Sequence, residues 1–187
     1  MSGAGEPRLD AQRQRRGPGP GAGTGEEWIV DTGPVIVLAK IGRLDLLTRL
    51  ARAVLLPSPV VQEIRRGPAV GPARRAVEAG WGTEVPVRYI RVAVRSLGLL
   101  GPGERSVLTL GLKRPGSRVI LDDRQARKGA ERLGLPMTGT VGVILFAQRR
   151  GLIPAVVPLF QAIRAAGLYV DDATLEQSAA GVGEAWP

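Results

Sequence analysis

Hydrophobic residues in this chain gather in short runs that alternate with longer amphipathic segments. Three runs rich in aliphatic and β-branched residues end at a turn residue or an acid, which predicts strands at 28–30, 53–56 and 118–121. Between them, apolar positions recur every three or four residues, which is typical of helices packed on one face. The predicted helices cover 34–40, 44–50, 58–66, 73–79, 102–113, 124–133, 139–150, 154–166 and 172–180.

Shorter apolar segments complete the predicted sheet. Residues 135–137 and 168–170 are expected to be short strands, and 83–94 an extended edge segment. Thr32 and Ser58 are expected to cap the helices that follow them. Strands separated by helices predict an α/β fold: a three-layer α/β/α sandwich around a mostly parallel sheet of four to five strands.

The two ends of the chain differ from its centre. Residues 1–26 are rich in Gly, Pro and Arg without a periodic apolar pattern, so we expect a disordered tail. A single domain is expected over 27–170, followed by a C-terminal helix and tail over 171–187. No apolar run approaches the roughly 20 residues of a membrane span, and the N-terminus lacks a signal-peptide core. We therefore expect a cytoplasmic protein without a membrane partner.

The chain contains no histidine and no cysteine. This excludes disulfides, thiolate nucleophiles, Ser-His-Asp triads and sites where imidazole binds a metal. If the protein is an enzyme, carboxylates must carry its chemistry. Carboxylate and water ligands suit hard cations, so a metal here would be Mg²⁺ or Mn²⁺.

A formal net charge of +9 predicts anionic partners, with nucleic acid first. Only three of the 26 basic residues are lysines, and an Arg-rich composition can also reflect a GC-rich genome. The charge alone therefore leaves both interpretations open. Because aromatic residues make up 4% of the chain, we do not expect base stacking to dominate nucleic-acid binding.

Acidic residues stand at the ends of two predicted strands and at the start of one predicted helix. Asp31 follows the first strand, Asp122 and Asp123 follow the strand at 118–121, and Glu104 lies in the first turn of a helix. The carboxyl ends of parallel strands share one edge of the sheet, where ligands bind in α/β proteins. We therefore expect these acids to lie in one crevice.

Each acid also has an ordinary structural interpretation. Asp31 and one member of the Asp pair can cap helices, Glu104 can offset a helix dipole, and Glu63 can be a solvated helical residue. Three or four carboxylates in one crevice would, however, repel one another. A divalent cation would relieve that repulsion, lower the pKa of a bound water and position the water for attack on a phosphodiester.

Five motifs occur in a fixed order along the chain. They are Val30-Asp31-Thr-Gly-Pro, Pro57-Ser-Pro-Val-Val-Gln-Glu63-Ile, Leu100-Gly-Pro-Gly-Glu104-Arg-Ser-Val-Leu, Val119-Ile-Leu-Asp-Asp123-Arg and Thr138-Gly-Thr-Val-Gly. Together they resemble a PIN-domain protein of the branch related to VapC-type toxins. The resemblance covers about residues 28–170. It implies a parallel α/β fold and a Mg²⁺- or Mn²⁺-dependent ribonuclease.

The resemblance also implies roles for individual residues. It carries the acidic positions of the family to Asp31, Glu63, Glu104 and Asp123, with Asp122 as the alternative metal ligand to Asp123. Thr32 and Thr140 would orient ligands or water. The candidates for gripping the RNA backbone are Arg65, Arg66, Arg74, Arg75, Arg124 and Arg127.

Two kinds of protein partner are expected, the first from the resemblance and the second from the apolar pattern of two predicted helices. A small antitoxin would insert an Arg-bearing segment into the acidic crevice. The apolar helices between Val141 and Ala166 could supply a homodimer face.

The chain departs from the family pattern at several positions. Gly33 stands where many PIN domains have Ser or Thr, and so does Leu121, before the Asp pair. Gln125 and Ala126 stand where a further acid is common. A catalytically inactive PIN-like module that binds nucleic acid or protein is therefore the alternative hypothesis.

Overall fold

The computed structural model describes residues 25–87 and 100–187. The strands are β1 (Glu27–Val30), β2 (Ala53–Pro57), β3 (Thr83–Val85), β4 (Arg118–Ile120) and β5 (Met137–Thr138). The helices are α1 (Thr32–Lys40), α2 (Asp45–Leu50), α3 (Ser58–Arg66), α4 (Pro72–Glu78), α6 (Pro102–Lys113), α7 (Arg124–Arg132), α8 (Thr140–Arg149), α9 (Val157–Ala165) and α10 (Asp172–Ala180).

The sheet has five strands in the order β3-β2-β1-β4-β5, and every adjacent pair is parallel. Trp28 pairs with Val54 on one side and with Arg118 on the other, which places β1 at the centre. Trp28, Ile29 and Val30 are completely buried, as expected of a strand covered on both faces. The structure confirms the predicted α/β class and the parallel sheet.

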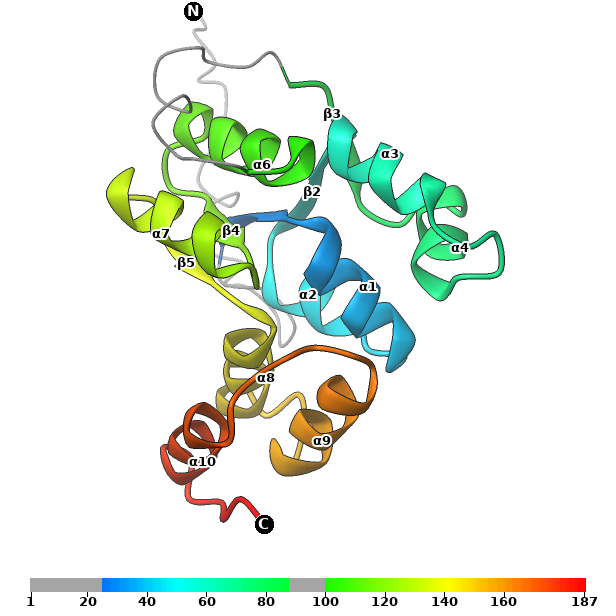
Figure 1. Cartoon of the computed structure of the whole chain (residues 1–187). Coiled ribbons are helices and arrows are strands. Elements are labelled where there is room, and N and C mark those ends of the chain that lie inside the picture. Colours follow the sequence, from blue (N-terminus) through cyan, green and yellow to red (C-terminus); the bar gives the residue numbers. More distant parts are fainter. Residues whose placement is uncertain (1–24, 88–99) are drawn as a thin grey trace, which may run out of the picture.

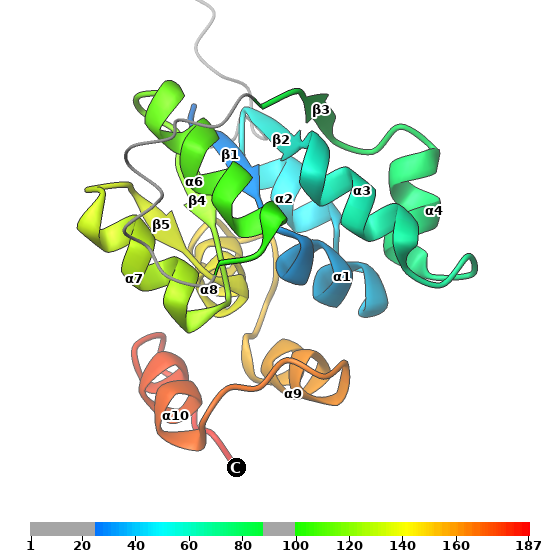
Figure 2. The same cartoon turned by 45° about the horizontal axis from the view of Figure 1, so that its top comes forward.

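Helices cover both faces of this sheet (Figures 1 and 2). On one face α6 packs over β1, β2 and β4, with α3 and α7 beside it. On the other face α2 packs on β2 and α8 on β5, and α10 packs against α8. Proline stands in the first turn of α3, α4, α6 and α9, where its missing N–H is no loss to the helix.

The last residues of the chain fold back onto the C-terminal helices. Both carboxylate oxygens of Glu184 accept hydrogen bonds from the N–H of Val156, at 2.8 and 3.0 Å, and Oε2 also accepts from Val157 N–H at 3.0 Å. The Trp186 ring lies 6.3 Å from the Phe160 ring, centroid to centroid. Residues beyond α10 therefore fix the start and the inner side of α9.

Some local predictions were wrong. Residues 168–170 form no strand: Leu168 and Val170 are half-buried against the core while Tyr169 points outward, so an irregular segment produces the same alternation. The strand predicted at 135–137 is instead β5, Met137–Thr138. Neither Thr32 nor Ser58 caps a helix through its side chain, because each lies inside its helix.

Two predictions concern residues whose structure is not described. Of the predicted extended segment 83–94, β3 accounts for Thr83–Val85, and residues 88–94 lie outside the described ranges. The predicted disordered tail, residues 1–26, lies outside them except for its last two residues. Within the described ranges, no helix is both long and apolar enough to cross a membrane.

Candidate active site

Asp31 stands between the central strand and α1. Its N–H donates to the carbonyl oxygen of Ile120 at 3.1 Å, which extends the β1–β4 ladder by one step and fixes the backbone. The residue is 7% exposed, and Oδ1 is buried without a hydrogen-bond partner in the described chain. Burial raises the pKa of Asp31 to about 7, and the negative charges of Glu104 and Glu63 add to the rise. The N–H groups of Thr32 and Gly33 partly oppose it.

Glu63 joins three helices at this edge of the sheet. Its Oε2 accepts a hydrogen bond of 2.6 Å from the Thr32 hydroxyl on α1, and its Oε1 accepts one of 2.8 Å from the Gly103 N–H on α6. A Cβ at Gly103 would lie 2.5 Å from Oε2, so a larger residue there would displace this carboxylate from its present position. The interpretation of Glu63 as a solvated helical residue is therefore wrong.

Glu104 lies in the first turn of α6, where its Oε2 accepts a 2.7 Å hydrogen bond from the Gly101 N–H. This is one half of a capping box, because Gly101 has no side chain that could supply the other half. This confirms its predicted helix-stabilising role. The pKa of Glu104 is nevertheless raised, first by burial and then by the charges of Asp123 and Glu63, against the Gly101 hydrogen bond. Glu104 therefore belongs to the same electrostatic cluster as Asp31.

The adjacent acids Asp122 and Asp123 point to different partners. Asp123 is exposed and caps α7, because its Oδ1 accepts from the N–H groups of Gln125 and Ala126 at 2.7 and 2.9 Å. Asp122 binds Thr140 twice: Oδ1 accepts from its N–H at 2.7 Å and Oδ2 from its hydroxyl at 2.6 Å. Burial raises the pKa of Asp122, against these two bonds and the charge of Arg127.

The residues match a hard cation in donor type and charge. All the acids supply oxygen ligands, and Asp31 offers a buried oxygen without a partner. Burial raises the pKa values of Asp31 and Glu104, and the charges of neighbouring acids add to both rises. As placed, however, no three acids of the described residues converge on one point. Glu63, Glu104 and Asp123 instead direct oxygens at backbone N–H groups.

The predicted RNA-binding arginines fall into two groups. Arg65, Arg74 and Arg75, on α3 and α4, contact Glu84, Glu78 and the Val70 carbonyl respectively. Arg66 on α3 is exposed. Arg124 and Arg127 lie on α7, across the molecule from α4 (Figures 1 and 2). Only the α7 group lies beside the Asp pair.

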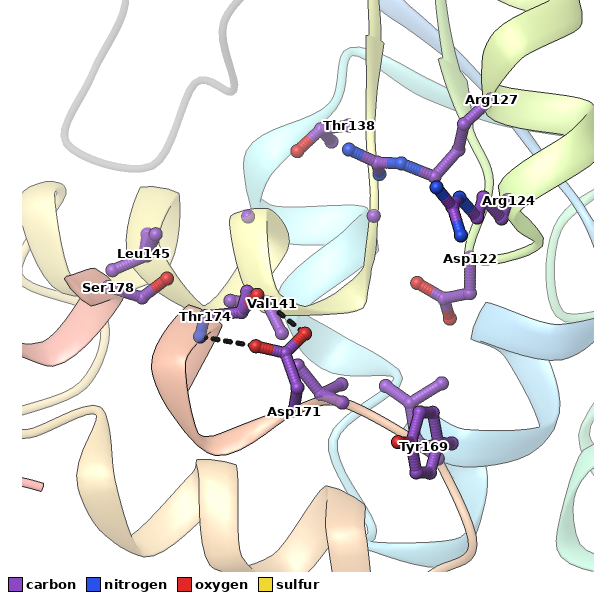
Figure 3. Close-up of a pocket in the computed structure, with 14 residues that line it drawn as sticks. Asp122, Arg124, Arg127, Thr138, Val141, Leu145, Tyr169, Asp171, Thr174 and Ser178 are labelled. Atoms are coloured by element: carbon purple, nitrogen blue, oxygen red, sulfur yellow. Dashed lines mark hydrogen bonds between the residues drawn. The ribbon is translucent and has the colours of Figure 1, made fainter. Parts of the chain in front are cut away.

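A groove of about 780 Å³ opens next to Asp122 (Figure 3). One side is formed by α7 and the start of α8, and the other by α10 and the segment that precedes it. Its lining includes Asp122, Arg124, Arg127, Thr138, Tyr169, Asp171 and Thr174. This groove runs from Asp122, at the carboxyl edge of the sheet, toward the C-terminal helices.

Sequence reasoning missed the glycines and the aromatic residue of this region. Gly103 admits Glu63, and Gly139 admits Asp122, since a Cβ there would lie 2.8 Å from Asp122 Oδ1. Both glycines stand inside the five sequence motifs, so the sequence shows their positions. It does not show the contacts with Glu63 and Asp122 for which a glycine is needed. Tyr169 belongs to no motif, and only the folded chain brings it near Asp122.

The fold and the site together define a class of protein: an all-parallel α/β protein with carboxylates at the carboxyl edge of its sheet. A family model described as a PIN domain matches residues 27–184, so this chain belongs to the PIN-domain family. The match confirms the resemblance to PIN domains; it is compatible with the branch related to VapC-type toxins but does not test that branch. No curated protein matches the chain. PIN domains have a nuclease-type fold; they are usually nucleases, bind nucleic acid and generally use divalent metal ions.

Proposed function

We propose that this protein is a metal-dependent endoribonuclease that hydrolyses RNA phosphodiester bonds. The observation that carries the proposal is Asp31: a buried carboxylate with an unpartnered oxygen, beside two further carboxylates whose charges act on it. Such an arrangement is unfavourable in a purely structural role, and a bound cation relieves it. Asp31, Glu104 and Asp123 would hold Mg²⁺ or Mn²⁺, with Asp122 as the alternative to Asp123.

The remaining residues would position the reactants. Glu63 is held by Thr32 and Gly103, so its carboxylate is fixed to orient the attacking water. Thr140 fixes Asp122 in the same way. When bound, a divalent cation lowers the pKa of a water and offsets the charge on the scissile phosphate. Arg124 and Arg127 would hold the RNA backbone beside the acids.

The biological setting belongs to the same proposal. The protein would act on RNA in the cytoplasm as the toxin of a toxin-antitoxin pair. Its antitoxin would place an arginine against the acidic cluster, where Asp31 offers an unpaired carboxylate oxygen. A homodimer would form through the C-terminal helices. Val143, Ile144, Phe160 and Ile163 of α8 and α9 are buried within their own chain and are not part of that surface.

One observation favours a second function, a catalytically inactive module that binds nucleic acid or protein. Glu63, Glu104 and Asp123 accept backbone hydrogen bonds, and the described acids do not converge on one point. In such a module these carboxylates would stabilise α6 and α7 only.

The test is cleavage of a labelled structured RNA pool by the purified full chain with Mn²⁺ or Mg²⁺, with EDTA as the metal-free control. We expect metal-dependent cutting that Asp31→Asn abolishes while the far-UV circular dichroism stays unchanged. Asp45→Asn is the matched control, because Asp45 pairs with Arg43 and Arg49 on the surface. It should cut like the unmodified protein.

The same assay decides between the adjacent acids. Asn caps a helix as well as Asp, so Asp123→Asn should keep the stability of α7 and lose cleavage if Asp123 binds metal. If Asp122→Asn alone loses cleavage, Asp122 is the ligand. Cutting that survives both EDTA and Asp31→Asn would contradict the proposal. The absence of both cutting and metal binding, the latter by calorimetry, would favour the inactive module.

A further inference from the structure

The side of the groove opposite α7 carries an aromatic ring directed into solvent. Tyr169 is 92% exposed, and it lies on the segment between α9 and α10, across the groove from Arg124 and Arg127 (Figure 3). Asp122 lies between them in the same view. An exposed tyrosine alone needs no explanation. This one stands at the rim of a concave site that also contains two guanidinium groups.

The backbone on both sides of Tyr169 is fixed. Before it, Gly167 adopts a φ of 103° and Leu168 N–H donates to the Ile163 carbonyl at 3.0 Å, which ends α9. After it, Asp171 caps α10 by accepting from the N–H and the hydroxyl of Thr174, each at 2.8 Å. The ring is therefore presented by a segment anchored at both ends, which lowers the entropy lost when a ligand stacks on it.

The cationic groups available in the groove are the guanidinium groups of Arg124 and Arg127. The side chain of Arg124 is exposed and makes no ion pair or hydrogen bond with any described residue. Arg127 donates one N–H to the Leu121 carbonyl at 3.2 Å, which leaves further donors. In both carboxylates that face the groove, Asp122 and Asp171, each oxygen already accepts a hydrogen bond from Thr140 or Thr174.

We propose that this groove binds one nucleotide of single-stranded RNA next to the scissile phosphate, with its base stacked on Tyr169 and its phosphate held by Arg124 and Arg127. A base is free to stack on a protein ring only when it is not stacked within a duplex. The volume of about 780 Å³ lies within the range of small-molecule sites. The position beside the acidic cluster rests on the proposed function, but the stacking and phosphate contacts do not require cleavage.

The test measures the affinity of the full chain for a fluorescent single-stranded oligouridylate of about 10 nucleotides. Fluorescence anisotropy reports the binding, and the measurement is repeated at several salt concentrations in EDTA. Tyr169→Phe should bind like the unmodified protein, and Tyr169→Leu should bind at least about 5-fold more weakly with an unchanged salt slope. Arg124→Gln should lower the slope of log K against log salt by about 0.7. Arg132→Gln, which removes the same charge at the far end of α7, should leave the slope unchanged.

Four outcomes would overturn the proposal. They are Tyr169→Leu binding as tightly as the unmodified protein, equal salt slopes for the two arginine variants, equal competition by a duplex of the same length, and failure to bind any RNA.

Cleavage separates this proposal from the nuclease assignment. Binding that depends on Tyr169 without any cutting in Mn²⁺ supports the groove and rejects the nuclease. If Tyr169→Leu cuts RNA with the same kcat/KM as the unmodified protein, nucleotide binding in the groove is rejected and the nuclease assignment stands.

Discussion

Asp31 links the stability of the metal-free protein to pH. In the unfolded chain its pKa is near the ordinary value of 3.8, and burial raises the folded value to about 7. Between these values the folded state holds a proton that the unfolded state has lost. Rising pH therefore favours unfolding over this interval.

We predict that the free energy of unfolding of the metal-free protein has a component that falls as pH rises from about 4 to about 7, by at most about 1.4 kcal/mol per pH unit. Asp31→Asn should lack this component, and Asp45→Asn should retain it. Urea denaturation in EDTA at several pH values measures the difference between variants. Parallel pH profiles for Asp31→Asn and the unmodified protein would show that Asp31 ionises normally in the folded state.

At the scale of single residues, residue types alone limited the candidate chemistry to carboxylates. The absence of histidine and cysteine left carboxylates, and the motifs placed Asp31, Glu63 and Glu104. Their partners were not predictable in the same way. The hydroxyl of Thr32 bonds to Glu63, 31 residues away, instead of capping its own helix, because folding brings α3 beside α1.

At the scale of elements, the start of α6 meets α3 through Gly103 and Glu63. The contact is close because glycine has no Cβ, and the Gly103 N–H then bonds directly to the carboxylate. Gly33, in the first turn of α1, is a matched comparison: a Cβ there would meet nothing within 4 Å. A change from glycine to alanine at both positions therefore separates the effect of displacing Glu63 from the general effect of adding a methyl group to a helix.

We predict that Gly103→Ala is less stable than Gly33→Ala by about 1–3 kcal/mol, because the Glu63 carboxylate must leave two hydrogen bonds. The free energy of unfolding of Gly33→Ala should equal that of the unmodified protein or exceed it by up to about 1 kcal/mol, because alanine has the higher helix propensity. Urea unfolding measures both, and RNA cleavage should fall in Gly103→Ala. Equal stabilities would mean that Glu63 finds equivalent partners elsewhere.

Strong local periodicity made most elements predictable. The helices over 58–66, 102–113 and 172–180 begin and end where the pattern placed them. The failures were short segments. Residues 168–170 alternate like a strand, but the sheet ends at β5, and the alternation instead reflects packing of an irregular segment over the core.

At the scale of the whole molecule, the C-terminal segment belongs to the folded unit that the family match defines, which extends to residue 184. Glu184 accepts hydrogen bonds from the N–H groups of Val156 and Val157 at the start of α9, where a negative charge is favourable. The segment after α9 carries Tyr169. Anchoring α9 therefore also anchors one side of the groove.

We predict that Glu184→Ala lowers the free energy of unfolding by about 1–2 kcal/mol, because it leaves these N–H groups without their acceptor. Glu176→Ala removes the same charge from an exposed position on α10 and should change stability by less than about 0.5 kcal/mol. Thermal or urea unfolding compares them. Similar losses in both variants would indicate an effect of net charge and not of the α9 contact.

Local periodicity predicted the α/β class and the parallel sheet, and residue types in a fixed order predicted the acidic positions and indicated the PIN-domain family. Only the folded chain shows which groups meet: Glu63 bonds to Thr32 and Gly103, and Asp122 bonds to Thr140, while Tyr169 and the arginines of α7 line opposite sides of one groove. These residues are 18 to 45 positions apart in the chain, as from Asp122 to Thr140 and from Arg124 to Tyr169. They arise from the packing of whole elements, for which no local pattern in the chain carries a signal.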